Sequence, residues 1–218
     1  MMTQESKPTM DGVVVVEELG DVGDVGGIYN RVDGVEGMMQ ILSAITDPTV
    51  RVFLDFDNCL MLNGKVHSEA LKAWVTAHRK QCWILTARKT PEKFKDLVRQ
   101  LRSETMLDAF SKDADNACAG WPDDVCVESE PVNGGGVELR HFRVLGTGPY
   151  NKGSVVEHLE GPIVFLDDNV FNAYECASLV TSYWVDLKAE ESLITIDEDW
   201  AYQDYYADFR KHYLSRSS

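Results

Sequence analysis

RVFLDFDN, residues 51–58, decides the fold, because a run of apolar residues leads directly into two acids, Asp55 and Asp57. A short apolar run bounded by polar residues is typical of a strand buried inside a parallel sheet. We therefore expect a strand over residues 51–56. Ligands of parallel α/β sheets bind beyond the carboxyl ends of the strands, so both acids are expected at a binding edge.

On both sides of this stretch, helical and strand patterns alternate. Apolar residues at three- and four-residue spacing predict helices over 32–46, 67–80, 90–102, 151–160 and 170–180. Short apolar runs predict further strands over 82–87, 161–168 and 182–187. Thr90 and Pro91 are suited to be the N-cap and first residue of their helix. The predicted fold is α/β, a three-layer Rossmann-like parallel sheet with helices on both faces.

Residues 106–149 interrupt this alternation. They contain the turn and loop signals WPDD, ESEPVNGGG and GTGP, with one strand predicted over 137–145. We interpret the segment as a small insertion that could form a lid.

Both ends of the chain differ from its middle. Residues 1–31 are glycine-rich and acidic, which predicts a flexible arm ahead of a main domain over 32–218. The tail from residue 188 is acidic and aromatic and is predicted to end in a helix. Its aromatic residues could pack on the sheet or form a dimer contact; they are Trp200, Tyr205, Tyr206, Phe209 and Tyr213.

Composition excludes several classes of protein. No apolar run approaches the roughly 20 residues that span a bilayer, and the N-terminus lacks the pattern of a secretory signal, so we expect a cytoplasmic protein with no membrane partner. The five cysteines form no CxxC pair and are expected to be reduced thiols. A net charge of −15 argues against general nucleic-acid binding, although residues 51–107 are basic.

Asp55 and Asp57 have the chemistry that phosphoryl transfer requires. A carboxylate can attack phosphorus, and a second one nearby can protonate the leaving oxygen and later deprotonate water. Two acids in a turn are also common as solvated residues. At the next strand end, the Thr86 hydroxyl and the neighbouring amides, including that of Ala87, could donate to phosphate, and Arg88 could bind an anionic substrate.

Two further positions extend this set. Lys152 opens a predicted helix, where its charge could hold phosphate, although single lysines at helix starts are often surface residues. Asp167 and Asp168 follow another predicted strand as adjacent carboxylates, which repel each other unless they are solvated or bridged by a cation. Carboxylates from here together with Asp55 would suit Mg²⁺.

The order DxD, Thr, Lys, DD across residues 50–187 resembles the four motifs of the haloacid dehalogenase (HAD) superfamily. The resemblance implies a HAD-like fold and a Mg²⁺-dependent phosphatase that acts through an aspartyl-phosphate. It implies that Asp55 is the nucleophile and a metal ligand. Asp57 would be the general acid/base and would also bind the metal through its backbone carbonyl. Cys59 departs from the pattern, since relatives usually carry threonine or valine there.

For the remaining motifs, the resemblance implies that Thr86 binds the phosphoryl group, that Lys152 stabilises it, and that Asp167 and Asp168 hold Mg²⁺. Which of the two acids binds the metal directly stays open. A large cap is absent from the pattern, and only the insertion stands in its place.

Three functions remain open from the sequence. A phosphorylated small molecule is favoured as the substrate, with residues 106–149 closing over it. A phosphatase acting on a protein or a polynucleotide end could instead use the basic stretch 79–102 for docking. The third possibility is a binding or regulatory protein that keeps the fold without turnover.

Overall fold

A computed structural model describes residues 30–112, 121–148 and 151–187 of the chain. The predicted arm, except for its last two residues, and the aromatic tail from residue 188 lie outside the described residues. In the part that the structure describes, no helix has the length and hydropathy needed to span a membrane.

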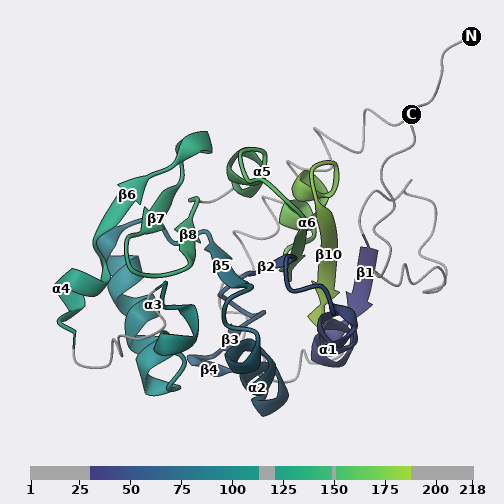
Figure 1. Cartoon of the computed structure of the whole chain (residues 1–218), viewed down its shortest axis with the longest axis horizontal. Coiled ribbons are helices and arrows are strands. Elements are labelled where there is room, and N and C mark those ends of the chain that lie inside the picture. The colour runs from purple at the N-terminus through teal and green to yellow at the C-terminus, as the bar shows by residue number, and fades with distance from the viewer. Residues whose placement is uncertain (1–29, 113–120, 149–150, 188–218) are drawn as a thin grey trace, which may run out of the picture.

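A sheet of eight strands runs through the middle of the described chain (Figure 1). Its first six strands pair in parallel, and the last two pairings, β8 with β7 and β7 with β6, are antiparallel. In order across the sheet they are β1 (Asn30–Asp33), β10 (Thr181–Asp186), β9 (Ile163–Asp167), β2 (Arg51–Leu54), β5 (Cys82–Thr86), β8 (Val144–Gly146), β7 (Val137–Leu139) and β6 (Ser129–Pro131).

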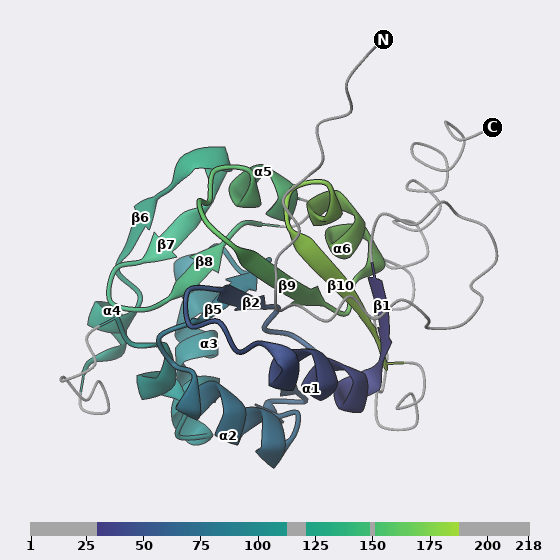
Figure 2. The same cartoon turned by 45° about the vertical axis from the view of Figure 1, so that its right-hand side comes forward.

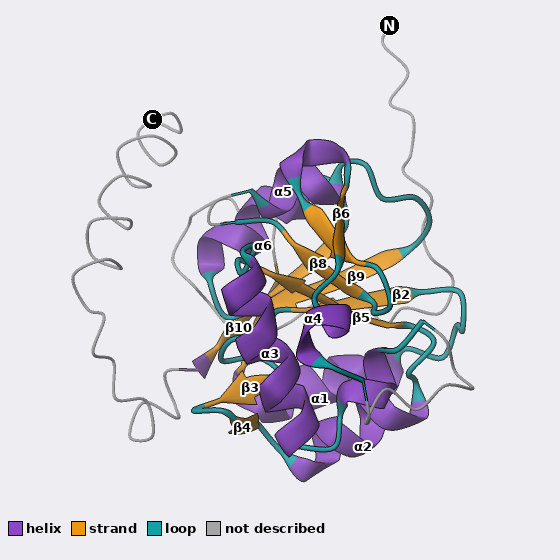
Figure 3. Cartoon of the chain, turned by 90° about the vertical axis from the view of Figure 1, so that its left-hand side faces the viewer, coloured by secondary structure: helices purple, strands orange, loops and turns teal. Residues whose placement is uncertain are grey.

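Helices cover both faces of this sheet, as Figures 2 and 3 show. Side chains of β2 alternate between the faces: Val52 and Leu54 belong to one buried cluster and Phe53 to the other. The first cluster includes residues of α1 (Gly34–Ala44), α2 (Glu69–Ala77) and α3 (Pro91–Ser103). The second includes residues of α5 (Lys152–Val156) and α6 (Val170–Ala177). The predicted α/β fold, with a mostly parallel sheet flanked by helices, is therefore confirmed.

The starts of two helices follow from side-chain caps. The Ser68 hydroxyl accepts a hydrogen bond from the Leu71 amide at 3.0 Å, ahead of α2. The Thr90 hydroxyl accepts one from the Lys93 amide at 3.4 Å, and Pro91 is the first residue of α3, as predicted. A side-chain cap satisfies one of the amides that a helix start leaves without a partner.

Two predicted elements need correction. The helix expected over 32–46 begins only at Gly34, because residues 30–33 form strand β1. This strand lacks an apolar run that would predict it, since Val32 is its one buried residue and Arg31 pairs with Asp186 of β10 at 2.9 Å. The single strand expected over 137–145 is two strands, β7 and β8, separated by a turn over residues 140–143.

The segment over 106–149 is therefore partly built into the sheet. Its strand β8 pairs in parallel with β5, and β7 and β6 extend the sheet from there. Among the described residues around these strands are the short helices η1 (Leu107–Phe110), α4 (Asp123–Cys126) and η3 (Asn133–Gly135). A small hairpin, β3 (Met61–Leu62) with β4 (Lys65–Val66), follows β2.

The described cysteines are buried reduced thiols, as predicted: Cys59, Cys82, Cys126 and Cys176. Burial raises the pKa of Cys82 to about 12, so this thiol stays neutral near pH 7.

The turn at η3 packs directly against the helix that carries Lys152. A Cβ atom added to Gly134 would lie 2.1 Å from the backbone oxygen of Ser154 in α5. The Asn151 side-chain amide also donates to the Gly134 carbonyl at 2.7 Å. Asn151, directly ahead of α5, is thus held by the turn between β6 and β7.

Gly134→Ala is expected to destabilise the protein by about 2–4 kcal/mol, because it combines a positive φ with a backbone clash. Gly64→Ala is the matched control: its φ is also +75°, but its Cβ would meet nothing within 4 Å. The control is expected to cost only about 1 kcal/mol. Urea unfolding of both variants measures the difference, and equal losses would contradict this packing.

Candidate active site

Two aspartates lie side by side at the carboxyl edge of the sheet. Strands β2 and β9 pair in parallel with Leu54 opposite Leu166, so Asp55 and Asp167 follow on neighbouring strands. The Asp55 amide donates to the Leu166 carbonyl at 2.9 Å, which extends the pairing by one residue. Both acids are almost fully buried, with 6% and 0% of their surface exposed.

Lys152 joins these two carboxylates. It is the first residue of α5, and 1% of its surface is exposed. Its ammonium group donates to Asp55 Oδ1 and, at 2.6 Å, to Asp167 Oδ2. The ammonium also lies 5.6 Å from the centre of the Phe165 ring. A lysine predicted as a phosphate-binding residue is thus held inside the acidic cluster.

Asp168 completes a set of three carboxylates. One oxygen each of Asp55, Asp167 and Asp168 lies within 4.8 Å of the others, so the three could hold a metal ion together. Three carboxylates and one ammonium leave a formal excess of two negative charges, which one divalent cation would balance. A set of carboxylate oxygens without nitrogen or sulfur ligands suits Mg²⁺ or Ca²⁺.

The two adjacent acids differ in their hydrogen bonds. Asp167 accepts from Lys152, from the Asn169 amide at 2.7 Å and from the Asn172 side chain at 3.0 Å. The Asp168 carboxylate accepts from the Asn58 side chain at 2.9 Å. Three hydrogen bonds from the protein itself fix the orientation of the Asp167 carboxylate.

Burial dominates the electrostatics of this cluster. It raises the pKa of Asp55 well above the ordinary value, opposed by Lys152 and reinforced by Asp167 and Asp168. Burial, with repulsion from Asp167, raises the pKa of Asp168 to about 7. For Lys152, burial alone would lower the pKa, but attraction to Asp167 and Asp55 outweighs it and the pKa is raised. A bound cation would favour the charged carboxylates.

Asp57 does not join the cluster of three carboxylates. Its side chain is half exposed, and both of its oxygens accept hydrogen bonds from Arg88, at 3.0 Å from Nε and 2.6 Å from Nη2. Its backbone carbonyl accepts from the Cys59 amide at 2.9 Å. Metal binding through that carbonyl stays a prediction. Cys59, two residues further along, is fully buried.

The end of β5 supplies the other predicted residues. Thr86 is fully buried, and its hydroxyl accepts from the Arg88 amide at 3.2 Å. The Thr86 carbonyl accepts from the Thr147 amide at 2.9 Å, which ties this strand end to the end of β8. Ala87 is exposed between Thr86 and Arg88. Because β5 pairs with β2, this loop borders Asp55 and Asp57.

Comparison with family models, curated proteins and solved structures gave no match.

Several polar partners of the site were not predicted from the sequence. Asn58 binds Asp168, Asn172 binds Asp167, and Asp96 binds Arg88 at 2.6 Å. Asn58 has a φ of 65°, a conformation that asparagine tolerates better than most residues. The position of Asn58 directly after the DxD motif was the one feature of the sequence that could have indicated a role for it in the site.

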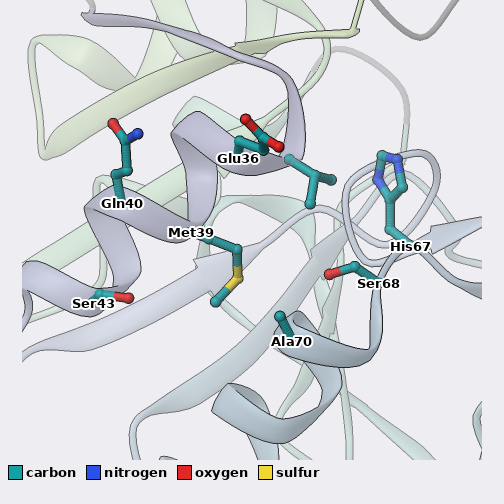
Figure 4. Close-up of a pocket in the computed structure, with 8 residues that line it drawn as sticks. Glu36, Met39, Gln40, Ser43, His67, Ser68 and Ala70 are labelled. Carbon is teal, nitrogen blue, oxygen red and sulfur yellow. The ribbon is translucent and has the colours of Figure 1, made fainter.

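A separate pocket of about 710 Å³ lies between α1 and the start of α2 (Figure 4). Glu36, Met39, Gln40 and Ser43 line it from α1, with His67, Ser68 and Ala70 opposite. None of the residues predicted for phosphate or metal binding lines it.

Proposed function

We propose that this chain is a Mg²⁺-dependent phosphatase of the HAD type that forms an aspartyl-phosphate on Asp55. One observation carries the proposal: Asp55, Asp167 and Asp168 converge at the carboxyl edge of the sheet, with Lys152 bridging the first two. This is the group of residues that the resemblance in sequence assigned to phosphoryl transfer.

Asp55 suits the role of nucleophile. Its Oδ1 is held by Lys152, which orients the carboxylate and leaves the second oxygen for attack on phosphorus. Breaking the ester bond gives the alcohol and an aspartyl-phosphate, which water then hydrolyses. Asp57 lies two residues further along and would give a proton to the leaving oxygen and accept one from water.

The remaining residues would bind the charged phosphoryl group. Lys152 provides a fixed positive charge, and the Thr86 loop provides amide and hydroxyl donors. Asp55, Asp167 and Asp168 would hold Mg²⁺, which when bound neutralises phosphate charge and favours attack by an anion. Preorganised charge of this kind is a large contribution to phosphoryl transfer.

A phosphorylated small molecule remains the favoured substrate class. Docking of a macromolecule through the basic stretch 79–102 loses support, because acids of α4 pair with the basic residues of α3. Asp124 binds Lys95 at 2.6 Å, and Asp123 binds Arg99 at 3.2 Å and also pairs with Arg102. These pairs offset the positive charge that a phosphorylated polymer would require.

Release of phosphate from 4-nitrophenyl phosphate tests the proposal. We expect turnover with Mg²⁺, loss of turnover in EDTA and recovery when Mg²⁺ is restored. A panel of sugar, nucleotide and amino-acid phosphates then ranks the small substrates. Absence of Mg²⁺-dependent release from this panel, and from a phosphopeptide and a phospho-oligonucleotide, would overturn the assignment.

A further inference from the structure

We propose that Arg88 is a positioning residue that orients the Asp57 carboxylate for proton transfer. This inference rests on the proposed phosphatase function. It assigns Arg88 a role toward another side chain of the enzyme, where the sequence indicated contact with an anionic substrate.

The Arg88 guanidinium is fixed from several sides. Its Nε and Nη2 atoms bind the two oxygens of Asp57, at 3.0 and 2.6 Å, and its Nη1 binds Asp96 Oδ2 at 2.6 Å. Asp96, on α3, also accepts from Gln100 at 2.9 Å. The guanidinium carbon lies 4.7 Å from the centre of the Phe56 ring. A planar fork with these contacts has few alternative positions.

Asp57 needs such a support. The side chain of Asp57 is 50% exposed whereas that of Arg88 is 16% exposed, so the acid lies in solvent and the arginine anchors it. A half-exposed aspartate in a loop would otherwise populate several rotamers. Because water screens the half-exposed Asp57 carboxylate, the pair adds only modestly to folding stability. Its main effect is therefore on the orientation of Asp57.

Proton transfer is compatible with this pairing. When Asp57 carries the proton on one oxygen, the guanidinium can keep its hydrogen bond to the other. The proton passes to the leaving oxygen as the phosphorus–oxygen ester bond breaks, and Asp57 becomes a carboxylate bound at both oxygens. In the second step, the same carboxylate accepts a proton from the water that attacks the aspartyl-phosphate.

A leaving-group comparison tests the role of Arg88. Phenyl phosphate needs protonation of its leaving oxygen more than 4-nitrophenyl phosphate does, because 4-nitrophenolate is the more stable anion. We expect Arg88→Ala to lower kcat/KM about 10- to 100-fold on phenyl phosphate and less than about threefold on 4-nitrophenyl phosphate. Arg88→Lys keeps the positive charge but cannot bind both oxygens of Asp57 in the same planar way. Its kcat/KM on phenyl phosphate should lie between those of the wild type and Arg88→Ala.

Two further variants complete the experiment. Asp96→Ala removes the contact of the guanidinium with Asp96. It should lower kcat/KM less than Arg88→Ala does, with the same dependence on the leaving group. Arg140→Ala is the matched control, because Arg140 also binds two acids, Glu128 at 2.5 Å and Glu130 at 3.0 Å, outside the site. The control should leave both kcat/KM values unchanged.

Each outcome is decisive. The positioning role would be overturned if Arg88→Ala and Arg88→Lys lowered kcat/KM equally on both substrates. It would also be overturned if Mg²⁺ raised the unfolding temperature of Arg88→Ala less than that of the wild type, since Arg88 touches none of the three clustered carboxylates. If the wild type turns over both substrates and the Arg88 variants show those equal losses in kcat/KM, only this inference is overturned. Absence of wild-type turnover on both substrates overturns the phosphatase proposal together with it.

Discussion

Asp55→Asn is expected to lower Mg²⁺-dependent phosphate release by at least about 10⁴-fold while leaving the fold intact. An amide nitrogen and oxygen replace the two carboxylate oxygens at nearly the same volume, but the side chain loses the charge that attacks phosphorus. The amide oxygen can still accept the hydrogen bond from Lys152. Phosphate release and thermal unfolding, measured on the same preparation, separate chemistry from stability.

Asp124→Asn is the control for this substitution. Asp124 is an exposed acid of α4 that pairs with Lys95, away from the clustered carboxylates, and its loss should leave the rate unchanged. If Asp55→Asn keeps more than about a tenth of the wild-type rate, the aspartyl-phosphate mechanism is wrong. An unfolded variant would show a shifted thermal transition, which distinguishes that result from a catalytic loss.

Lys152→Met is expected to destabilise the metal-free protein by about 3 kcal/mol or more. Methionine has a similar length and fits an apolar site, but the three carboxylates at the sheet edge then lose the ammonium that pairs with two of them and offsets one negative charge. Removing one partner of a buried ion pair leaves an uncompensated charge. Urea unfolding in EDTA measures the loss directly.

Lys95→Met provides the comparison, because it removes a lysine from an exposed pair with Asp124. Exposed ion pairs contribute about 0–1 kcal/mol, so the free energy of unfolding of Lys95→Met should stay close to that of the wild type. Mg²⁺ should recover more stability in Lys152→Met than in Lys95→Met, since a cation replaces part of the missing charge. A loss below about 1 kcal/mol for Lys152→Met would contradict this account of the cluster.

The positions of the clustered acids could be predicted from the sequence, because they depend on local patterns. Asp55 and Asp167 each follow a short apolar run, and parallel strands bring such ends to one edge. Lys152 was predicted at the start of a helix and is found there. These positions could be predicted from the apolar patterns of strands and helices, together with the rule that ligands bind at the carboxyl ends of parallel strands.

The pairing of side chains could not be predicted in the same way. Asn58 binds Asp168 across 110 residues of sequence, and Arg88 binds Asp57 across 31. Strand β1 was missed because its stability depends on β10, which lies about 150 residues further along the chain. Such contacts follow from register and rotamers that the folded sheet selects, and residue spacing alone does not specify them.

The position of β2 between β5 and β9 has a consequence for synthesis on the ribosome. β5 follows soon after β2 in the chain, but the other neighbour of β2 is made only when residues 163–167 emerge. Until then the nascent chain has Asp55 beside an open strand edge, without Asp167. Long-range parallel pairing is slow to form, and open edges invite association with other chains. Early translation arrest therefore yields an incomplete sheet that chaperones would recognise.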